Sequence, residues 1–587
     1  MKRIAVVEKE RCNPEGCGGY LCIKKSPLNR MGVEAIVQGP DGKAQINEDL
    51  ATDALQVVVN VCPFHAIHMV KLPEHLTTRP IHRYGKDQFI LYSLPTPTFG
   101  KVVGIIGVNG IGKSTAIKIL AAALKPNLGD SERTDVDVDE LIKLFKGTEM
   151  QIFMEKFKKE EIIVSFKPQE VELIQKNAKG KVKELLDKVN ETKKLKEVIE
   201  VLELTNILDT DINKISGGEM QRVAIAATVL KKANLYIFDE PSSFLDIKQR
   251  LKIARFIRDL ANEETSVLVI EHDLIVMDYM TDLVNIMYGK EKVYGIVSQL
   301  KPAKTGMNAY LEGYLKDDNV RFRDHKIEFD IRSADKEKKK DVRFEWPAME
   351  KKLGNFHLKA NAGSIKNQEV IGILGPNGIG KTTFMKLLAG VEEPDSGKLD
   401  TTVSISYKPQ NLASDSEELV MNVLKEAIQY HTNDIIDPLN LKDLFTRQLK
   451  QLSGGELQRV AVAEALGKKA DIILLDEPSA YLDTEQRLNI SKIIRNVADT
   501  TGKAILVVDH DLVFLDYVAN RLIVFEGEPA IEGKQIGPVK MEEGMNLLLK
   551  EVEITLRRDE QTGRPRINKL DSVMDRKQKD ADKYYYS

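Results

Sequence analysis

The sequence predicts an α/β fold in which one domain type occurs twice, after a short N-terminal segment that holds all four cysteines. Two glycine-rich segments, GVNGIGKS at 107–114 and GPNGIGKT at 375–382, lie 268 residues apart. The segments ISGGEMQR at 215–222 and LSGGELQR at 452–459 lie 237 residues apart. Blocks that recur in one order at a nearly constant offset indicate a duplicated domain. We call the two copies the first repeat and the second repeat.

The composition excludes several classes of protein. The 587 residues are 42% hydrophobic and 30% charged, with a net charge of −3, which is ordinary for a folded globular chain and not for a disordered one. No apolar run approaches the ~18 residues that cross a bilayer, and the charges in MKRIAVVEKERC oppose a signal peptide. We therefore expect a cytoplasmic protein without a membrane partner. Any contact with nucleic acid must come from local basic patches, since the net charge is slightly negative.

Motifs and changes in composition divide the chain into five segments. The expected segments are the cysteine-bearing residues 1–75, the first repeat at 76–300, a linker at 301–340, the second repeat at 341–537 and a C-terminal hinge segment at 538–587. The linker ends in DKEKKKD, a charge run typical of a solvated segment. The block GMN follows each repeat, at 306–308 and at 544–546, which predicts a helical hinge segment after each copy.

The two repeats differ by an insertion. Lys113 and Gln169 lie 56 residues apart, whereas the corresponding Lys381 and Gln410 lie 29 apart, so the first repeat carries 27 additional residues. These fall at about 130–160, where apolar and charged residues alternate with helical spacing. The pattern predicts an inserted helical hairpin, either functional or a solvated decoration of the surface.

Both glycine-rich segments have the context of a phosphate-binding loop, with a buried strand before each loop and a helix after it. Glycines let successive backbone N–H groups point at one anion, and the helix N-terminus adds partial positive charge. Lys113 and Lys381 are expected to reach the terminal phosphates of ATP, and Ser114 and Thr382 to ligate Mg²⁺. The predicted nucleotide-binding residues of the two loops are Gly107, Asn109, Gly110, Gly112, Lys113, Ser114, Thr115, Gly375, Asn377, Gly378, Gly380, Lys381, Thr382 and Thr383.

A pair of carboxylates ends a buried apolar run in each repeat. The runs NLYIFDE and DIILLDE are typical of buried parallel strands. Asp239 and Asp476 are predicted to hold Mg²⁺. Glu240 and Glu477 come one residue later, at the strand edge where α/β sheets carry their chemistry, and are predicted to orient or polarise the attacking water. A solvated strand end is the alternative for one such pair, but two pairs in the same context favour a catalytic site.

These motifs, in this order, resemble those of the ATP-binding-cassette (ABC) ATPases, with two cassettes in one chain. The resemblance makes Gln169 and Gln410 the Q-loop glutamines that reach Mg²⁺, and His272 and His510 the switch histidines that sense the γ-phosphate. It also makes the SGGE segments the signature loops, which adds the nucleotide-binding residues Ser216, Gly217, Gly218, Ser453, Gly454 and Gly455.

The ABC family implies that two cassettes pair head to tail, so that each signature loop completes the ATP site of the other cassette. One site would join Lys113 to Ser453, and the other would join Lys381 to Ser216. Two helix N-termini facing one triphosphate are physically reasonable, because both supply N–H groups. Glutamate replaces the common signature glutamine in both loops and can still make polar contacts.

Aromatic residues before each phosphate-binding loop are candidates to stack on adenine. Tyr84 and Phe89 precede the first loop, and Phe344, Trp346 and Phe356 precede the second. A place in the hydrophobic core is the alternative for all of them.

The N-terminal segment resembles a bacterial two-cluster ferredoxin, an α+β domain, with half of its ligands replaced. In such ferredoxins the fourth cysteine of each run ligates the cluster of the other run. Applied here, this rule places one [4Fe–4S] cluster between Cys12, Cys17, Cys22 and Cys62. Structural zinc or no metal at all are the alternatives, since thiolates alone do not select the metal.

The second cluster is predicted to be absent. Its ligand positions hold Ser26, Thr52, Leu55 and Val58, which bind iron poorly. All four of its ligands are thus replaced together. We expect Leu55, Val57, Val58, Val59 and Val61 to fill this place as an apolar plug.

A ferredoxin-like domain joined to two cassettes and a hinge resembles the E subfamily of ABC ATPases, the RNase L inhibitor family of archaea and eukaryotes. HRY at 82–84, LPTP at 94–97 and the tail TGRPRINKLDS also match that pattern. The resemblance implies an ATP-driven factor that splits ribosomes into subunits after termination or rescue and then binds the small subunit. The alternative is an ABC ATPase of another soluble class, such as another translation factor or a transporter-associated ATPase.

The same resemblance implies the partners. These are the ribosome, chiefly the small subunit and its rRNA, a release factor or a Pelota-type rescue factor, and initiation factors, with the chain itself a monomer. Contacts to rRNA are expected from basic clusters in the N-terminal segment, the insertion and the hinge, although such clusters are also typical of solvated faces. The clusters include Lys24, Lys25, Arg30, Arg557, Arg558, Arg564 and Arg566.

Overall fold

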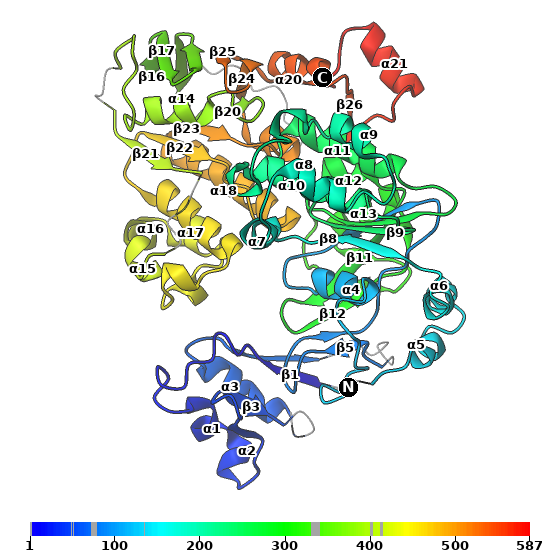
Figure 1. Cartoon of the computed structure of the whole chain (residues 1–587). Helices are drawn as coiled ribbons and strands as arrows, with labels where there is room; N and C mark the ends of the chain where they lie inside the picture. The colour runs from blue at the N-terminus through cyan, green and yellow to red at the C-terminus, as the bar shows by residue number, and fades with distance from the viewer. Residues whose placement is uncertain are drawn as a thin grey trace. The chain divides into compact units, whose positions relative to one another are not determined.

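The computed structural model describes residues 3–47, 50, 52–71, 79–133, 135–329, 341–399, 403–410, 412 and 415–586. The boundary expected at 75–76 and all but the last residue of the charge run DKEKKKD lie outside the described residues. The chain forms two compact units (Figure 1). The first unit comprises Met1–Pro241, Phe256–Glu271 and Thr281–His325, and the second comprises Ser242–Arg255, His272–Met280 and Lys326–Ser587. In the described part of the chain, no helix has both the length and the apolarity that crossing a membrane requires.

The first unit is built on a mixed sheet whose central strands are parallel. The sheet order is β5 (His82–Arg83), β6 (Ile90–Leu91), β12 (Tyr294–Val297), β11 (Leu283–Lys290), β7 (Val102–Ile106), β10 (Ser266–Ile270), β9 (Leu235–Asp239) and β8 (Val164–Lys167), with β13 (Lys301–Pro302) on β11. Strands β7, β9 and β10 are buried along their whole length. Strands buried on both faces of a parallel sheet are continuous apolar runs, as the sequence shows here.

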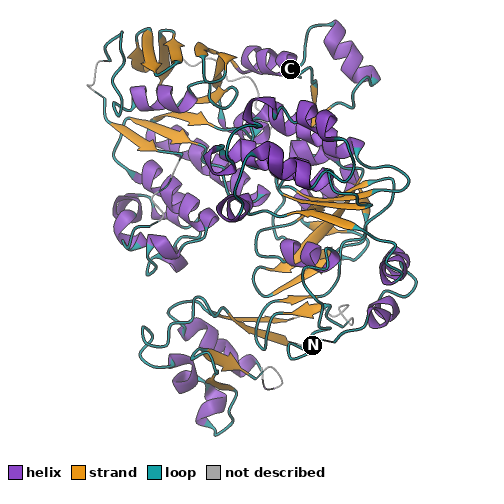
Figure 2. Cartoon of the chain, viewed as in Figure 1, coloured by secondary structure: helices purple, strands orange, loops and turns teal. Residues whose placement is uncertain are grey.

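The second unit repeats this topology. Its sheet order is β17 (Met349–Leu353), β18 (Phe356–Ala360), β25 (Glu532–Lys540), β24 (Arg521–Glu528), β20 (Val370–Leu374), β23 (Ala504–Val508), β22 (Ile472–Asp476) and β21 (Ile405–Lys408). Strand β20 pairs in parallel with β23 and β24, as β7 does with β10 and β11. The matching strand order of the two sheets confirms the duplicated α/β fold that the sequence predicts. Figure 2 shows strands of the chain with helices beside them.

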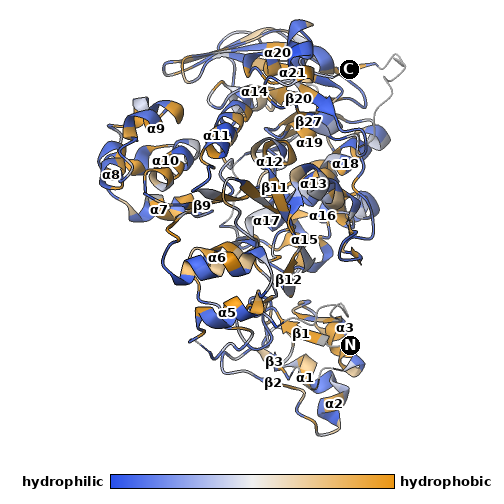
Figure 3. Cartoon of the chain, turned by 90° about the vertical axis from the view of Figure 1, so that its right-hand side faces the viewer, coloured by the Kyte–Doolittle hydropathy of each residue, from blue (hydrophilic) through white to orange (hydrophobic). Residues whose placement is uncertain are grey.

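Helices surround each sheet. Those of the first repeat are α4 (Lys113–Leu120), α5 (Val138–Leu144), α6 (Glu149–Lys158), α7 (Val171–Asn177), α8 (Val182–Lys188), α9 (Leu195–Val201), α10 (Gly217–Val229), α11 (Ile247–Asp259) and α12 (Leu274–Met280), and α13 (Ala303–Glu312) follows it. Those of the second are α14 (Lys381–Leu388), α15 (Val420–Val423), α16 (Lys425–Tyr430), α17 (Gly454–Gly467), α18 (Thr484–Thr501) and α19 (Leu512–Val518), and α20 (Met541–Glu551) and α21 (Val573–Asp580) follow it. Figure 3 shows mixed polar and apolar surfaces on helices such as α6 and α11, as expected for helices with one buried face.

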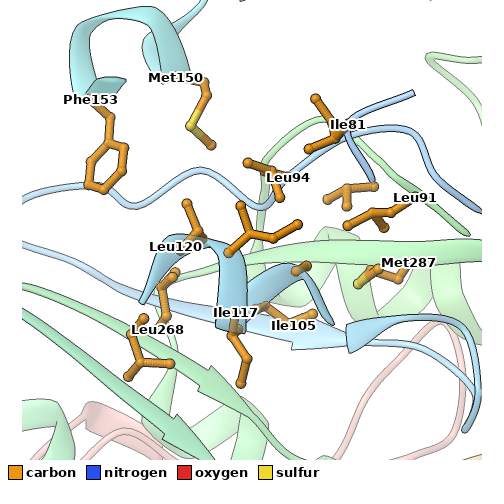
Figure 4. Close-up of a cluster of buried hydrophobic side chains, with 14 of the residues drawn as sticks. Ile81, Leu91, Leu94, Ile105, Ile117, Leu120, Met150, Phe153, Leu268 and Met287 are labelled. Atoms are coloured by element: carbon orange, nitrogen blue, oxygen red, sulfur yellow. The ribbon is translucent and has the colours of Figure 1, made fainter. Parts of the chain in front are cut away.

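The inserted segment of the first repeat contains the helices α5 and α6, which pack against each other. Met150 and Phe153 are buried and belong to the same core cluster as Leu120 at the end of α4. In Figure 4 their side chains point toward Leu120 and Leu94. The insertion is therefore part of the hydrophobic core of the repeat and not a solvated decoration of its surface.

The N-terminal segment forms a small α+β layer in which β1 (Arg3–Val7) pairs with β4 (Ile67–Lys71) and β2 (Ile36–Gln38) with β3 (Ala44–Ile46). Three short helices accompany the strands, α1 (Leu21–Lys25), α2 (Pro27–Arg30) and α3 (Gln56–Val61). Leu55 and Val58 are fully buried in its core, as expected for the apolar plug. Val57 is 47% exposed, so it does not contribute to the plug, because on a short helix it lies on the face opposite to the core.

A β-hairpin follows α20 near the C-terminus. Its strands are β26 (Leu556–Arg558) and β27 (Pro565–Ile567). Arg564, at its turn, is fully buried, and Arg558 and Arg566 are paired with carboxylates. Arg564 is therefore not accessible for the expected rRNA contact, because it is fully buried. For Arg558 and Arg566, which are partly exposed, and for the exposed Arg557, the contact stays a prediction.

Candidate active sites

The two phosphate-binding loops join a central strand to the following helix, β7 to α4 and β20 to α14. Gly112 and Gly380 stand immediately before these helices with φ of +94° and +97°. A Cβ on Gly112 would lie 2.5 Å from Cζ of Phe89, and one on Gly380 would lie 2.9 Å from Cζ of Phe356. Both the backbone angle and the aromatic ring beneath each loop thus require glycine.

Each loop lysine turns back into its own loop. Nζ of Lys113 donates to the carbonyl oxygens of Gly107 at 2.8 Å and Val108 at 2.9 Å. Nζ of Lys381 donates to the carbonyl oxygens of Gly375 at 2.8 Å and Pro376 at 2.6 Å. Burial lowers the pKa of Lys381 to about 8, against the opposing charges of nearby carboxylates. Each lysine places a cation inside the curl where the loop N–H groups would meet an anion.

A hydroxyl and a carboxylate meet beside each loop. Oγ1 of Thr382 donates to Oδ2 of Asp476 at 2.8 Å. Oδ1 of Asp476 is buried and has no hydrogen-bond partner among the described residues. In the first repeat the side chain of Ser114 hydrogen-bonds Asp239, whose pKa rises to about 6 because of burial and then the charge of Glu240. Two hard oxygen donors, one of them a buried carboxylate oxygen without a partner, fit a Mg²⁺ ion.

Glu240 and Glu477 directly follow β9 and β22, each with φ of +48°. Nε2 of Gln169 donates to Oε1 of Glu240, and Nε2 of Gln410 to Oε1 of Glu477, each at 2.8 Å. Burial, followed by the charge of Asp476, raises the pKa of Glu477. A positive φ in a non-glycine residue is strained and is retained where the surroundings hold it, commonly at functional sites.

The sequence did not predict the side chains that hold these two glutamates in place. Nε2 of Gln221 donates to the carbonyl of Glu240 at 2.6 Å, and Nε2 of Gln458 to that of Glu477 at 2.6 Å. The buried Nζ of Lys167 donates to the carbonyls of Asp239 at 2.8 Å and Glu240 at 3.2 Å. Nζ of Lys408 does the same in the second repeat, at 2.7 Å to Asp476. The repeated triplet KPQ and the repeated QR after SGGE were the available signals.

Each signature serine caps a helix. Ser216 precedes α10 and Ser453 precedes α17, and each forms a capping box with the glutamate three residues later. Oγ of Ser216 donates to Oε2 of Glu219 at 2.7 Å. The N-terminal N–H groups of α10 and α17 are thereby oriented as an anion site requires. The pairing of Lys113 with Ser453 and of Lys381 with Ser216 joins residues of different units and stays a prediction.

The switch histidines follow β10 and β23, two residues before α12 and α19. Nε2 of His510 lies 3.6 Å from Oε1 of Glu477. Burial, followed by the charges of Lys381 and Arg250, holds the pKa of His510 well below its usual range, so the imidazole is neutral at neutral pH. His272 is likewise buried. A neutral imidazole can both donate and accept a hydrogen bond, one at each ring nitrogen.

Within the second unit, the loop that starts α11 meets the second phosphate-binding loop. Oδ2 of Asp246 accepts from N of Asn377 at 3.0 Å, and the carbonyl of Phe244 accepts from Nδ2 of Asn377 at 3.1 Å. Arg250 bonds Asp273 at 3.1 Å, beside His272, as Arg487 bonds Asp511 at 3.1 Å, beside His510.

The aromatic candidates fall into three groups. Tyr84 is 49% exposed, and its hydroxyl lies 3.0 Å from Oγ1 of Thr115 in the first loop. Phe344 and Trp346 are buried in the core of the second repeat, which favours the alternative of a core role. Phe89 and Phe356 pack beneath the loops. Of these five, Tyr84 is the most exposed, Phe89 and Phe356 are partly buried, and Phe344 and Trp346 are buried.

The four cysteines line one pocket of the N-terminal segment, together with Tyr20, Ala44, Pro63 and Ile67 among others. N of Ala44 donates to Sγ of Cys12 at 3.4 Å, and burial raises the pKa of the Cys22 thiol to about 11. Among the residues that the structure describes, no group of three or more His, Cys, Asp or Glu side chains is arranged to hold a metal ion. Four thiols on one apolar pocket nonetheless supply the donor set of an iron–sulfur cluster.

The place of the second cluster does not fit such a group. Leu55 and Val58 fill it with buried apolar side chains. The buried hydroxyl of Ser26 caps α2 by accepting from N of Asn29 at 3.3 Å. No thiolate faces this place among the described residues, because all four cysteines line the other pocket.

These features define an ABC-type ATPase with two cassettes. They are two phosphate-binding loops, the paired carboxylates that end β9 and β22, two signature helices capped by serine, and two switch histidines. The sequence pattern of the family described as "ABC transporter" matches residues 97–243 and 358–480. The chain is an ATPase of this type.

The whole chain is similar to several known proteins. "ABC transporter E family member 1" of Arabidopsis thaliana is 41% identical over 599 residues, covering 100% of this chain and 99% of the relative. An archaeal ribosome recycling factor, solved with the ribosomal stalk protein aP1, is 51% identical with a TM-score of 0.83, covering 88% of this chain and 100% of the other. A model of ribosome-bound archaeal Pelota and ABCE1 gives 49% identity and a TM-score of 0.92, covering 100% of this chain and 99% of the other. The chain belongs to the E family of ABC proteins, the family of the RNase L inhibitor.

Proposed function

We propose that this chain recycles ribosomes: ATP drives it to split them into subunits after termination or rescue, and it then stays on the small subunit. One observation carries the proposal. Two sets of ATP-site motifs and a cysteine-lined N-terminal domain occur together in a chain that matches, over its full length, a structure described as ribosome-bound Pelota and ABCE1. The proposed partners are accordingly the ribosome, its small-subunit rRNA and a release or rescue factor, in the cytoplasm.

In the proposed catalytic cycle, each loop lysine and the backbone N–H groups of its loop bind the β- and γ-phosphates. Mg²⁺, when bound, neutralises phosphate charge. The residues that would hold it are Ser114, Gln169 and Asp239 at the first site, and Thr382, Gln410 and Asp476 at the second. Glu240 and Glu477 then orient the attacking water, while His272 and His510 contact the γ-phosphate. The hydrogen bond from each Q-loop glutamine to its glutamate supports this assignment.

The two cassettes are proposed to pair within one chain, so that each signature loop completes the site of the other cassette. The bond between Asp246 and the phosphate-binding loop at Asn377 supports this arrangement. ATP can shift the equilibrium toward the paired form only by its greater affinity for that form. Two triphosphates, each bound by two loops, would supply that difference. The N-terminal domain would move with the first cassette, because N of Val7 donates to the carbonyl of Asp87 and Nζ of Lys292 bonds Glu8.

The N-terminal domain is proposed to hold one [4Fe–4S] cluster through Cys12, Cys17, Cys22 and Cys62. The apolar pocket and the N–H donor at Cys12 support it. The cluster would serve as a rigid centre for a domain with a small core. The domain boundaries given in the sequence analysis are likewise proposals.

Purified without oxygen, the chain is expected to contain about four iron atoms, because one cubane uses four thiolates and the second site has none. Cys62→Ser is expected to lower the iron content to near zero. Val57→Ser, at an exposed position of α3, which ends just before Cys62, is the matched control and should keep all of the iron. Iron and acid-labile sulfide analysis with an electron paramagnetic resonance spectrum measures both. About eight iron atoms would contradict the single cluster, and stoichiometric zinc would favour the alternative metal.

The function is tested with 70S-type archaeal or 80S ribosomes, a rescue factor and the purified chain. We expect separated subunits on sucrose gradients with ATP or a non-hydrolysable analogue, and none with ADP. With the analogue the chain should sediment with the small subunit. Sedimentation that does not depend on the nucleotide, or intact ribosomes under all conditions, would contradict recycling and favour another class of ABC ATPase.

A further inference from the structure

The helices that follow the two switch histidines carry a repeated aspartate. The sequences are HDLIVMD from His272 and HDLVFLD from His510, so Asp278 and Asp516 stand six residues after their histidines. The side chains of these two aspartates are only 3% and 8% exposed. The helices α12 and α19 begin two residues after the histidines, so each aspartate is separated from its histidine by less than two helical turns of chain. We call α12 and α19 the switch helices.

Both aspartates are bound by the same β-hairpin, which we call the tail hairpin: β26, β27 and the turn between them. Arg566 on β27 bonds Asp278 with two nitrogens, Nε at 2.6 Å and Nη2 at 2.9 Å. The fully buried Arg564 adds Nη2 to Asp278 at 3.4 Å and Nη1 to the carbonyl of Leu274 at 3.4 Å. A bidentate, buried arginine–carboxylate pair fixes geometry more strongly than a single ion pair does.

The other strand of the tail hairpin reaches the second switch helix. Nη2 of Arg558 on β26 lies 3.4 Å from Oδ2 of Asp516, and its guanidinium lies 4.3 Å from the ring centroid of Tyr586. The hydroxyl of Tyr586 bonds Oδ2 of Asp516 at 3.1 Å, and the hydroxyl of Tyr585 bonds Oδ1. The C-terminal segment is itself tied to β26, since N of Leu556 donates to the carbonyl of Tyr584 at 2.8 Å.

The tail hairpin is held together by side-chain hydrogen bonds of its own arginines. Asp559 lies next to Arg558, and its Oδ2 accepts from Nη1 of Arg566 at 3.3 Å. Nη1 of Arg558 donates to the carbonyl of Gly563 at 2.9 Å, across the turn. Each of the two arginines is thus held by a hydrogen bond within the hairpin. All of these residues lie within the second compact unit.

We propose that Asp278 and Asp516 are positioning residues through which the tail hairpin couples the two switch histidines, so that hydrolysis at one ATP site changes the rate at the other. The coupling rests on the proposed function, in which His272 and His510 contact the γ-phosphate. The element with two states is the position of a switch helix, and each ATP site biases it. Coupling between two sites typically changes binding affinities by about 5- to 150-fold, and we take the lower end of that range as the expected effect on rates.

The test is the additivity of steady-state ATPase rates in the full chain. Independent sites require that the kcat values of Glu240→Gln and Glu477→Gln sum to the kcat of the unmodified chain. We expect that sum to differ from the unmodified kcat by about fivefold or more. Adding Asp516→Asn or Asp278→Asn to all three proteins should restore additivity to within about twofold, with the KM for ATP unchanged. Asp582→Asn, an exposed carboxylate of the same tail, is the matched control and should leave the non-additivity intact.

Asp278→Asn leaves the buried Arg564 without its charge partner and can unfold the chain. Thermal unfolding is therefore measured for every variant, and Asp516→Asn with the milder Tyr586→Phe carries the test if Asp278→Asn does not fold. Non-additivity that persists in folded Asp516→Asn overturns the proposal, as does additivity in the unmodified chain. If Glu240→Gln and Glu477→Gln keep full activity, the catalytic assignment fails instead. Additivity is then measured with Lys113→Ala and Lys381→Ala, which separates the two failures.

Discussion

Replacement of Glu477 by glutamine is expected to slow hydrolysis at the second ATP site by about 10²- to 10⁴-fold, the range that positioned general bases contribute, while ATP still binds. Glutamine keeps the shape of the side chain and can retain a hydrogen bond to Gln410, but it cannot accept a proton from water. The burial that raises the pKa of Glu477 makes it a stronger base, which is what the role requires. Single-turnover hydrolysis in a Lys113→Ala background isolates the second site.

The matched control for this experiment is Glu526→Gln, an exposed carboxylate on β24 of the same sheet, which should keep the full rate. Glu240→Gln is the equivalent change at the first site, measured in a Lys381→Ala background. A rate within about threefold of the unmodified site in both variants is far below the effect of a lost general base and would refute the assignment of both glutamates.

Lys381→Ala is expected to weaken ATP binding at the second site by about 10- to 150-fold. The change removes a charge-assisted contact to phosphate worth about 1.5–3 kcal/mol, and each ~1.4 kcal/mol is tenfold in affinity. Equilibrium titration with a fluorescent ATP analogue measures the effect, again with Lys113→Ala to silence the first site. Lys534→Ala, on β25 of the same sheet, is the control and should bind ATP normally. Undiminished affinity in Lys381→Ala would contradict the role of this lysine.

The pKa of Lys381 predicts how ATP affinity at the second site changes with pH. Burial lowers that pKa to about 8, and a bound triphosphate raises it by adding negative charge. Between these two values the ATP-bound chain holds more protons than the free chain, so affinity is constant below about pH 8 and falls as pH rises above it. Lys381→Arg, which stays protonated throughout, should bind ATP with no such decline. The same titrations at pH 7, 8 and 9 test this.

The duplicated α/β fold could be predicted because its signals are local and occur twice. Apolar runs such as NLYIFDE are buried strands, and both glycine-rich loops lie between a strand and a helix. The positions of Glu240 and Glu477 at strand ends followed from the same runs. Duplication also helped, since one motif can arise by chance and two in the same context rarely do.

The remaining features could not be predicted because they depend on contacts between distant residues. Lys167 and Gln221 act on the backbone carbonyl of Glu240, and residue type alone does not reveal a bond to a carbonyl 73 or 19 positions away. Trp346 and Tyr84 have the same aromatic character in sequence, but one lies in the core and the other does not. The basic tail resembled an RNA-binding patch, because a sequence shows positive charges without showing the carboxylates, such as Asp278, that neutralise them.

The contact of Met150 and Phe153 with the end of α4 has a consequence for how the two halves of this chain can be exchanged. A first repeat from which the insertion is cut out would lack the apolar residues that cover Leu120 and would expose that part of its core to water. The two repeats therefore need different lengths of chain to complete their hydrophobic cores. Any chimera or transplant of the first half into another scaffold must carry its α5–α6 hairpin with it.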